Sequence, residues 1–146
     1  MMAGWGATLL VNESRRVRAG GGTVCVCGVD DLPTGWPDFE AALSGSAGAD
    51  YVVLLSHAPL AARLAGRHGR VDLILSGHTH GGQIRVPLLW RMALPPCTGG
   101  FTAGLYRVGQ THLYVSRGFG ANGPLPVRFR CPAEVTLFEL DGATAA

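Results

Sequence analysis

The sequence has no long hydrophobic run. None of its apolar stretches approaches the ~20 consecutive residues that a membrane-spanning helix needs. The first residues also lack the order of a signal peptide, because Arg15 and Arg16 follow the short apolar stretch Ala7 to Val11 instead of preceding it. We therefore expect a protein of the cytoplasm or of the membrane periphery.

Charge is scarce as well. Charged residues make up 15% of the chain, and the formal net charge is +2. The arginines are scattered, with only Arg15 and Arg16 adjacent, so no basic stripe indicates a nucleic-acid partner. The hydrophobic share of 47% is typical of a globular protein, and 146 residues are enough for one domain with a proper core.

The four cysteines form no Cys-x-x-Cys pair, which argues against the commonest zinc and redox motifs. Cys25 and Cys27 fall on one face of an expected strand, so we interpret them as buried free thiols. A metal site is the alternative for this pair. Free thiols favour a reducing compartment.

What the chain does have is a series of short, branched, apolar runs between glycines and prolines, which indicates an α/β protein. The expected helices are Phe39 to Leu43, capped by Asp38, and Leu60 to Ala65. The expected strands are Ala7 to Val11, Thr23 to Val29, Tyr51 to Leu55, Val71 to Leu75, Gln83 to Pro87, Leu105 to Val108, Thr111 to Val115 and Ala133 to Leu140.

Two histidines, His78 and His80, follow the strand Val71 to Leu75 in a turn flanked by glycines. In open α/β sheets, ligands bind beyond the carboxyl ends of the strands. Neutral imidazoles at this place are candidate ligands for a divalent metal. The alternative is a structural turn in which His-x-His occurs by chance.

A third histidine, His57, ends the strand Tyr51 to Leu55. Strand, helix and strand at this spacing form a βαβ unit, whose two strands are parallel neighbours. Their carboxyl ends share one edge of the sheet. We therefore expect His57 to lie close to His78 and His80.

Three histidines are only part of a metal shell, since one metal takes about four to six ligands. A hydrolytic site with two ions also needs carboxylates. The chain offers few, because Asp30 and Asp31 are the only acidic pair at a strand end and Asp50 precedes its strand.

These residues resemble a known family. Ser56-His57 and the segment Gly77 to Gln83 are similar to the last two motifs of calcineurin-like metallophosphoesterases. Segments similar to a bacterial, membrane-associated phosphodiesterase-type branch are Asn12-Glu13, Gly28 to Asp31, Ser116 to Gly120 and Pro126 to Arg128. The resemblance runs from about Leu9 to Leu140.

The resemblance implies a metal-dependent phosphodiester or phosphomonoester hydrolase with an α/β fold, a β-sandwich flanked by helices (αββα). It implies two divalent ions, with His57 and His78 on one ion, His80 on the other, and a metal-bound hydroxide as the nucleophile. Histidine ligands suit Mn, Fe or Zn.

From their positions, Gly81, Gly82 and Gln83 would shape the turn and let a phosphoester substrate approach the backbone. Arg117 lies on a glycine-rich loop at a strand end and would bind the phosphate; a surface loop arginine without such a role is the alternative.

The chain resembles only the C-terminal half of that family, as a single partial domain over residues 1–146. The family's Asp-x-His, Gly-Asp-x-x-Asp and Gly-Asn-His motifs are absent, and with them the motif that holds the catalytic histidine. Either an upstream segment or partner chain supplies them, or the chain is a non-catalytic fragment or assembly module. We expect the chain alone to bind metal weakly and to hydrolyse phosphodiesters poorly.

Other polar residues have simpler interpretations. We predict that His68 is exposed, because it lies just past the end of a predicted helix, and that His112, which opens a predicted strand, is structural. Metallo-β-lactamase and amidohydrolase sites also use His-x-His. Both are excluded, because Gly81 and Gly82 follow His80 and few histidines or aspartates remain downstream.

Overall fold

The computed structural model of the protein describes residues 6–121 and 126–141. The predicted domain limits at residues 1 and 146 lie outside this range. The described strands are β1 (Glu13–Ala19), β2 (Gly22–Gly28), β3 (Tyr51–Leu55), β4 (Leu73–Ser76), β5 (Gly104–Val108) and β6 (Thr111–Val115). The described helices are α1 (Phe39–Leu43) and α2 (Ala61–Leu64), and the 3₁₀ turns are η2 (Ser44–Ser46), η3 (Ala65–Arg67), η4 (His80–Gly82) and η5 (Trp90–Ala93).

All six described strands belong to one mixed sheet, in the order β1-β2-β3-β4-β6-β5. The four central strands β2, β3, β4 and β6 are parallel, while β1 and β5 pair antiparallel at the two edges. The predicted α/β class is confirmed. Within the described residues it is built on this single sheet, so they do not form the second sheet of the expected sandwich.

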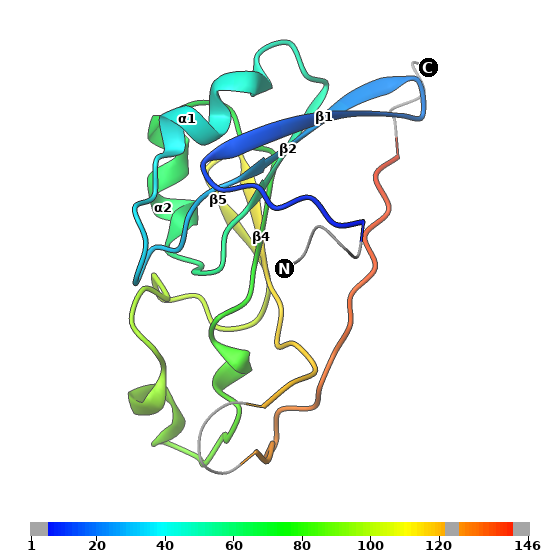
Figure 1. Ribbon diagram of the computed structural model, residues 1–146. Helices are drawn as coiled ribbons and strands as arrows, with labels where there is room; N and C mark the ends of the chain where they lie inside the picture. The colour runs from blue at the N-terminus through cyan, green and yellow to red at the C-terminus, as the bar shows by residue number, and fades with distance from the viewer. Residues whose placement is uncertain (1–5, 122–125, 142–146) are drawn as a thin grey trace.

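The helices α1 and α2 cover one face of the sheet, and the segment 132–141 runs along the other side (Figure 1). Asp38 begins α1 by accepting a hydrogen bond from the Ala41 amide at 2.9 Å, as its sequence position predicts. Burying a side chain such as Leu54 or Ile74 stabilises the fold by about 1.5–3 kcal/mol. The buried cluster consists of Cys25, Cys27, Val29, Phe39, Ala42, Leu43, Ala49, Val52, Leu54, Ala61, Ala62, Ala65, Val71, Ile74, Leu113 and Val115.

The predicted βαβ unit is confirmed. Strands β3 and β4 pair in parallel, with Val53 opposite Leu73 and Leu55 opposite Leu75, and α2 lies between them in the chain. The predicted hairpin of β5 and β6 around Gly109 and Gln110 is also present.

Three predicted strands are wrong. Residues 7–11 are not a strand; β1 begins at Glu13, because Asn12 turns the chain with a φ of +55°. Leu10 instead crosses β2 so closely that a Cβ on Gly28 would lie 2.5 Å from the Leu10 carbonyl oxygen. Residues 83–87 make only the isolated bridge of Ile84 to Phe129.

The third is residues 133–140, which have no ladder although their sequence alternates. Side-chain hydrogen bonds hold this segment instead: the Tyr114 hydroxyl donates to Glu134 and accepts from the Thr136 hydroxyl. No helix in the described part of the chain is both long and apolar enough to cross a membrane.

Candidate metal centre

The sheet ladder continues past the ends of β3 and β4 and sets the histidine positions. The Ser56 amide donates to the Leu75 carbonyl at 3.1 Å, and the Gly77 amide donates to the His57 carbonyl at 3.1 Å. His57 is thereby held beside the first residues of the segment 77–83, which we call the histidine turn. These two backbone hydrogen bonds therefore explain why His57 lies beside the histidine turn, as the sequence predicts.

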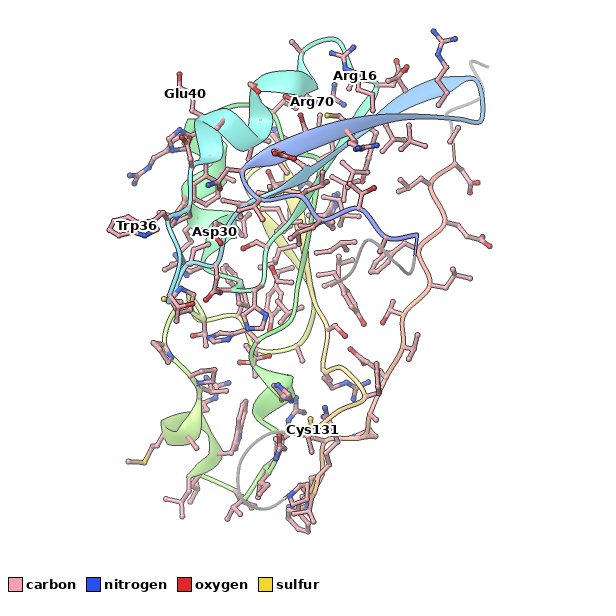
Figure 2. The ribbon with its side chains drawn as sticks, viewed as in Figure 1. Arg16, Asp30, Trp36, Glu40, Arg70 and Cys131 are labelled. Atoms are coloured by element: carbon pink, nitrogen blue, oxygen red, sulfur yellow. The ribbon has the colours of Figure 1, made fainter. Side chains whose placement is uncertain are left out.

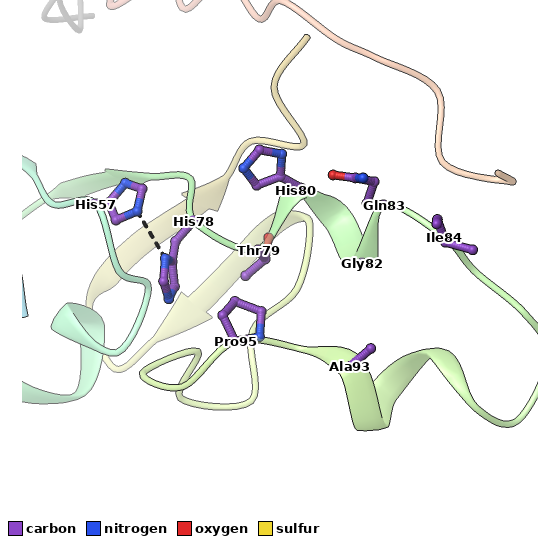
Figure 3. Close-up of a pocket in the computed structure, with 9 residues that line it drawn as sticks. All are labelled: His57, His78, Thr79, His80, Gly82, Gln83, Ile84, Ala93 and Pro95. Atoms are coloured by element: carbon purple, nitrogen blue, oxygen red, sulfur yellow. Dashed lines mark hydrogen bonds between the residues drawn. The ribbon is translucent and has the colours of Figure 1, made fainter. Parts of the chain in front are cut away.

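His57 and His78 are in direct contact (Figure 3). The Nε2 atom of His57 lies 3.0 Å from the Nδ1 atom of His78, and their rings meet edge to face at 4.7 Å between centroids. His78 Nε2 donates to the Pro96 carbonyl oxygen at 2.8 Å, since a carbonyl can only accept. In a neutral His78 ring, Nδ1 is then the acceptor that faces His57.

The pKa of His57 is lower than the ordinary histidine value. Partial burial is the main cause, the neighbouring His78 acts in the same direction, and the charge of Asp31 opposes both. A neutral imidazole is the form that binds metals. Two ring nitrogens 3.0 Å apart also match neighbouring ligands that lie at about 2.1 Å from one ion.

The histidine turn has an unusual backbone. His78, His80 and Gln83 have φ values of +68°, +49° and +36°, a left-handed region that residues other than glycine rarely adopt. Thr79 lies buried between the two histidines, and its hydroxyl donates to the Thr102 carbonyl at 2.6 Å. Such strain persists only when surrounding contacts fix it, and it gathers at functional sites.

His57, His78 and His80 line one cavity, which has a volume of about 440 Å³ (Figure 3). The Nδ1 atom of His80 is buried and has no hydrogen-bond partner among the described residues. Burying a polar atom without a hydrogen-bond partner costs about 1–3 kcal/mol. A ligand bound to this nitrogen would remove that cost, which is a physical reason to consider His80 a metal ligand. The cavity is lined by His57, His78, Thr79, His80, Gly82, Gln83, Ile84, Ala93 and Pro95.

Arg128 holds the turn from a distant segment. Its guanidinium donates to the carbonyl oxygens of His80 at 3.2 Å, Arg117 at 2.6 Å and Gly120 at 3.0 Å. The buried thiol of Cys131 also donates to the His80 carbonyl at 3.3 Å. The left-handed His80 backbone is thus fixed by contacts from Arg128 and Cys131.

Gly81 and Arg117 are packed against each other. A Cβ on Gly81 would lie 2.5 Å from Arg117 Cγ and 2.8 Å from Cys131 Sγ. Arg117 forms a salt bridge with Glu134, and this bond raises the pKa of the guanidinium. The arginine predicted to bind phosphate therefore already has an anionic partner.

The carboxylates at the end of β2 behave differently from each other. Asp30 accepts hydrogen bonds from the amides of Trp36 at 2.9 Å and Asp31 at 2.8 Å, which lower its pKa and make it a turn residue. Asp31 Oδ1 is buried and has no hydrogen-bond partner in the described ranges. The described residues bring no group of three or more histidine, cysteine, aspartate or glutamate side chains together for a metal. The histidines therefore fit part of a metal shell.

The remaining candidates lie elsewhere. His68 is exposed, as predicted, and stacks on Phe39 at 5.6 Å, while His112 is exposed on β6. Cys25 and Cys27 are free and buried, with sulfur atoms 3.7 Å apart. Burial, with the hydrogen bond to Cys25, raises the pKa of Cys27 to about 12, so this thiol stays protonated.

Sequence reasoning missed four contributors to the site: Thr79, the Pro96 carbonyl, Arg128 and Cys131. Thr79 lies inside the motif itself and could have been noticed there. The Pro96 contact is made by a backbone carbonyl, and Cys131 lies about 50 residues from the turn, so no residue pattern marks either one. Arg128 belongs to the family-like segment Pro126 to Arg128, but that resemblance does not indicate its contact with the His80 carbonyl.

The sequence matches no protein-family model. It is similar to an uncharacterized metallophosphoesterase, YkuE, of Bacillus subtilis, with 43% identity over 122 residues that cover 84% of this chain and 42% of the relative. A transmembrane protein with metallophosphoesterase domain from Bos taurus is 39% identical over 149 residues, covering 92% of this chain and 32% of the relative. Phosphodiesterase YaeI of Escherichia coli is 46% identical over 69 residues, covering 47% of this chain and 25% of the relative.

The chain thus spans 42% or less of the length of these three relatives, which is consistent with the C-terminal half of such proteins. Among solved structures, a sulfate thiohydrolase, SoxB, of Thermus thermophilus is similar over 70% of this chain and 19% of that chain, with 29% identity. The TM-score is 0.45, which is too low to establish a common fold.

Proposed function

Because the chain belongs to the metallophosphoesterase family, we propose that it forms the histidine-bearing part of a divalent-metal site that hydrolyses phosphoesters. The observation that supports this most directly is the meeting of His57 Nε2 and His78 Nδ1 at 3.0 Å. These two histidines would hold one ion. His80, whose buried Nδ1 lacks a partner among the described residues, would hold a second ion.

The residues of this chain would hold the metal ions and orient the substrate. The ions would supply Lewis-acid polarisation of the phosphoryl group. Imidazole ligands favour Mn, Fe or Zn. Thr79 and Arg128 fix the turn, and Gly81 leaves the space that Arg117 and Cys131 occupy against it. Arg117 would bind a substrate phosphate in competition with Glu134.

A complete site requires carboxylates, and no described aspartate or glutamate is among the residues that line the cavity. We propose that a partner chain, or a further segment of a longer protein, supplies them opposite the histidine turn. A non-catalytic assembly module with the same histidines is the second candidate, and the incomplete ligand set favours it for the isolated chain.

Calorimetric titration of the chain with Mn²⁺ tests the proposed ligands. We expect weak binding by the wild type and at least about tenfold weaker binding for His57→Ala, His78→Ala and His80→Ala. His112→Ala is the matched control, because this histidine is exposed and lies on β6 outside the cavity. Equal Mn²⁺ affinity in all five proteins would contradict the metal site.

Hydrolysis of bis-p-nitrophenyl phosphate with Mn²⁺ separates the two candidate functions. We expect slow turnover, or none, by the isolated chain. Rapid turnover that His78→Ala abolishes would show that the chain needs no partner for its ligands. A chain that binds Mn²⁺ but stays inactive until a protein bearing the Asp-x-His and Gly-Asp-x-x-Asp motifs is added supports the partner model.

A further inference from the structure

His78 takes its orientation from a loop that is itself held by α2. We call residues 96–102 the support loop, since Pro96 and Thr102 at its two ends accept hydrogen bonds from the histidine turn. We propose that Arg63 of α2 is a positioning residue of the metal centre: it holds the support loop so that His78 is left with Nδ1 as its ligand atom. The proposal rests on the proposed function and adds to it a residue outside the cavity.

The support loop contacts the histidine turn at two places. The Pro96 carbonyl accepts a hydrogen bond from His78 Nε2 at 2.8 Å, and the Thr102 carbonyl accepts one from the Thr79 hydroxyl at 2.6 Å. Pro95, which precedes the loop, lines the same cavity as His78 (Figure 3). A histidine that binds a metal usually donates its other ring N–H to a carbonyl or carboxylate. Pro96 supplies that acceptor, so Nδ1 is the nitrogen left for the ion.

Arg63 ties the middle of the support loop to α2. Its Nε atom donates to the Gly99 carbonyl at 2.8 Å, and its guanidinium lies 5.1 Å from the centre of the Phe101 ring. Just before the helix, the Leu60 amide donates to the Cys97 carbonyl at 3.0 Å. A charged donor forms a stronger hydrogen bond than a neutral one, and the contact with the aromatic ring adds to it. Arg63 is therefore a strong tie between the helix and the loop.

The support loop is also closely packed. Gly99 has a φ of +62°, and a Cβ on it would lie 3.1 Å from the Leu60 Cα atom. At the end of the loop, the Thr102 amide donates to the Tyr106 hydroxyl oxygen of β5 at 3.1 Å. The loop is thus tied to α2, to β5 and to the histidine turn. Loss of one tie should change where the Pro96 carbonyl lies.

Solution NMR of the metal-free chain at about pH 8, where an ordinary histidine is neutral, tests the support of His78. We expect a signal from the His78 Nε2 proton in the wild type, because a hydrogen-bonded proton exchanges slowly with water. Its absence from the spectrum of His78→Ala assigns it. In Arg63→Ala this proton should exchange at least about tenfold faster. The measurement needs no metal, so it separates a failure of this proposal from a failure of the proposed function.

Calorimetric titration with Mn²⁺ tests the consequence for the metal. Arg63→Ala should weaken Mn²⁺ binding at least about threefold, which is less than the loss of a ligand because Arg63 acts through the loop. Gly99→Ala is a second variant that keeps the arginine. It should act in the same direction on both measurements, because its Cβ pushes the loop away from Leu60. Circular dichroism checks that each variant is folded.

Arg16→Ala is the matched control. The Nε atom of Arg16 also donates to a glycine carbonyl, that of Gly45, at 2.9 Å. Figure 2 shows Arg16 at the end of the molecule opposite the labelled Cys131, whose thiol donates to the His80 carbonyl of the histidine turn. This variant loses the same kind of bond far from the cavity. It should change neither the exchange of the His78 proton nor the Mn²⁺ affinity.

Three outcomes would overturn the role of Arg63. The first is wild-type exchange and wild-type Mn²⁺ affinity in both Arg63→Ala and Gly99→Ala. The second is an equal change in Arg16→Ala. The third is faster exchange with unchanged Mn²⁺ affinity, because His78 would then bind the ion without the support loop. A wild type that binds no Mn²⁺ would overturn the proposed function, while the proton exchange still decides whether Arg63 supports His78.

Discussion

The two histidines of the histidine turn, His78 and His80, both adopt a left-handed backbone, which places their side chains. Such a conformation costs about 1–2 kcal/mol per residue. The contacts of Thr79 with Thr102, and of Arg128 with the His80 carbonyl, stabilise it. The two imidazoles therefore line the cavity because their backbone is strained, and the contacts with distant residues offset the cost of this strain.

At Gly81 the same turn leaves no space for a side chain. We predict that Gly81→Ala lowers the free energy of unfolding by about 2–4 kcal/mol, the sum of overpacking against Arg117 and Cys131 and of a φ of +63°. Gly109→Ala is the control, because Gly109 has a φ of +62° but no described atom within 4 Å of its added Cβ.

Urea unfolding of both variants gives the comparison. Gly109→Ala should show only the backbone cost, about 1–2 kcal/mol. A loss in Gly81→Ala no larger than that of Gly109→Ala would mean that Arg117 and Cys131 move aside without cost. The close packing would then have no energetic consequence.

At the scale of elements, the C-terminal segment is held by side chains in place of a strand ladder. Glu134 accepts hydrogen bonds from the Arg117 amide at 2.8 Å and from the Tyr114 hydroxyl at 3.1 Å, and it pairs with the Arg117 guanidinium. Burial alone would raise the pKa of Glu134. The hydrogen bonds and the arginine charge outweigh burial and lower that pKa below its usual 4.5.

This lowered pKa predicts a pH-dependent contribution to stability. Because the folded-state pKa lies below the unfolded one, the stabilisation is present above about pH 4.5 and is lost as the pH falls through the folded value. Glu134→Gln should therefore unfold more easily than the wild type at neutral pH, by about 1–3 kcal/mol, and the difference should shrink in acid.

Urea unfolding at a series of pH values measures this difference. Glu139→Gln, an exposed glutamate in the same segment, is the control and should follow the wild type. A difference between Glu134→Gln and the wild type that stays constant from neutral to acidic pH would show that the ion pair does not titrate as described.

At the scale of the whole molecule, the edge strand β1 and the C-terminal segment differ in which side chains they expose to solvent. The edge strand β1 carries Arg15, Arg16 and Arg18 on exposed positions, and charge of this kind discourages pairing with another chain. Val135 and Leu137 on the C-terminal segment are both 85% exposed and carry no such protection.

We predict that the chain associates with itself in a concentration-dependent way through this segment. Val135→Asp combined with Leu137→Asp should shift the chain toward the monomer, because the apolar contact is lost and like charges repel. Sedimentation velocity over a range of concentrations measures the effect. Trp36→Asp is the control, because Trp36 is also exposed, and equal dissociation in that variant would place the contact elsewhere.

Much of the fold could be predicted because its cause is local. The apolar runs at Tyr51–Leu55 and Thr111–Val115 and the cap at Asp38 depend on neighbours in the chain, and all three are present. The strands predicted over residues 7–11 and 133–140 are wrong, because an alternating or apolar run forms a strand only when a partner edge is free to pair with it. Tertiary structure decides whether such a partner edge is present.

For the candidate site, the sequence by itself determined which residues stand at the strand ends: His57, His78 and His80. The βαβ spacing also determined that His57 and His78 meet, since parallel neighbours share one carboxyl edge. Only the tertiary structure decided how the imidazoles are turned, because Thr102, Pro96 and Arg128 bond to the turn from distant loops. It also decided that Arg117 faces Glu134, since a charge finds its partner through space and not along the chain.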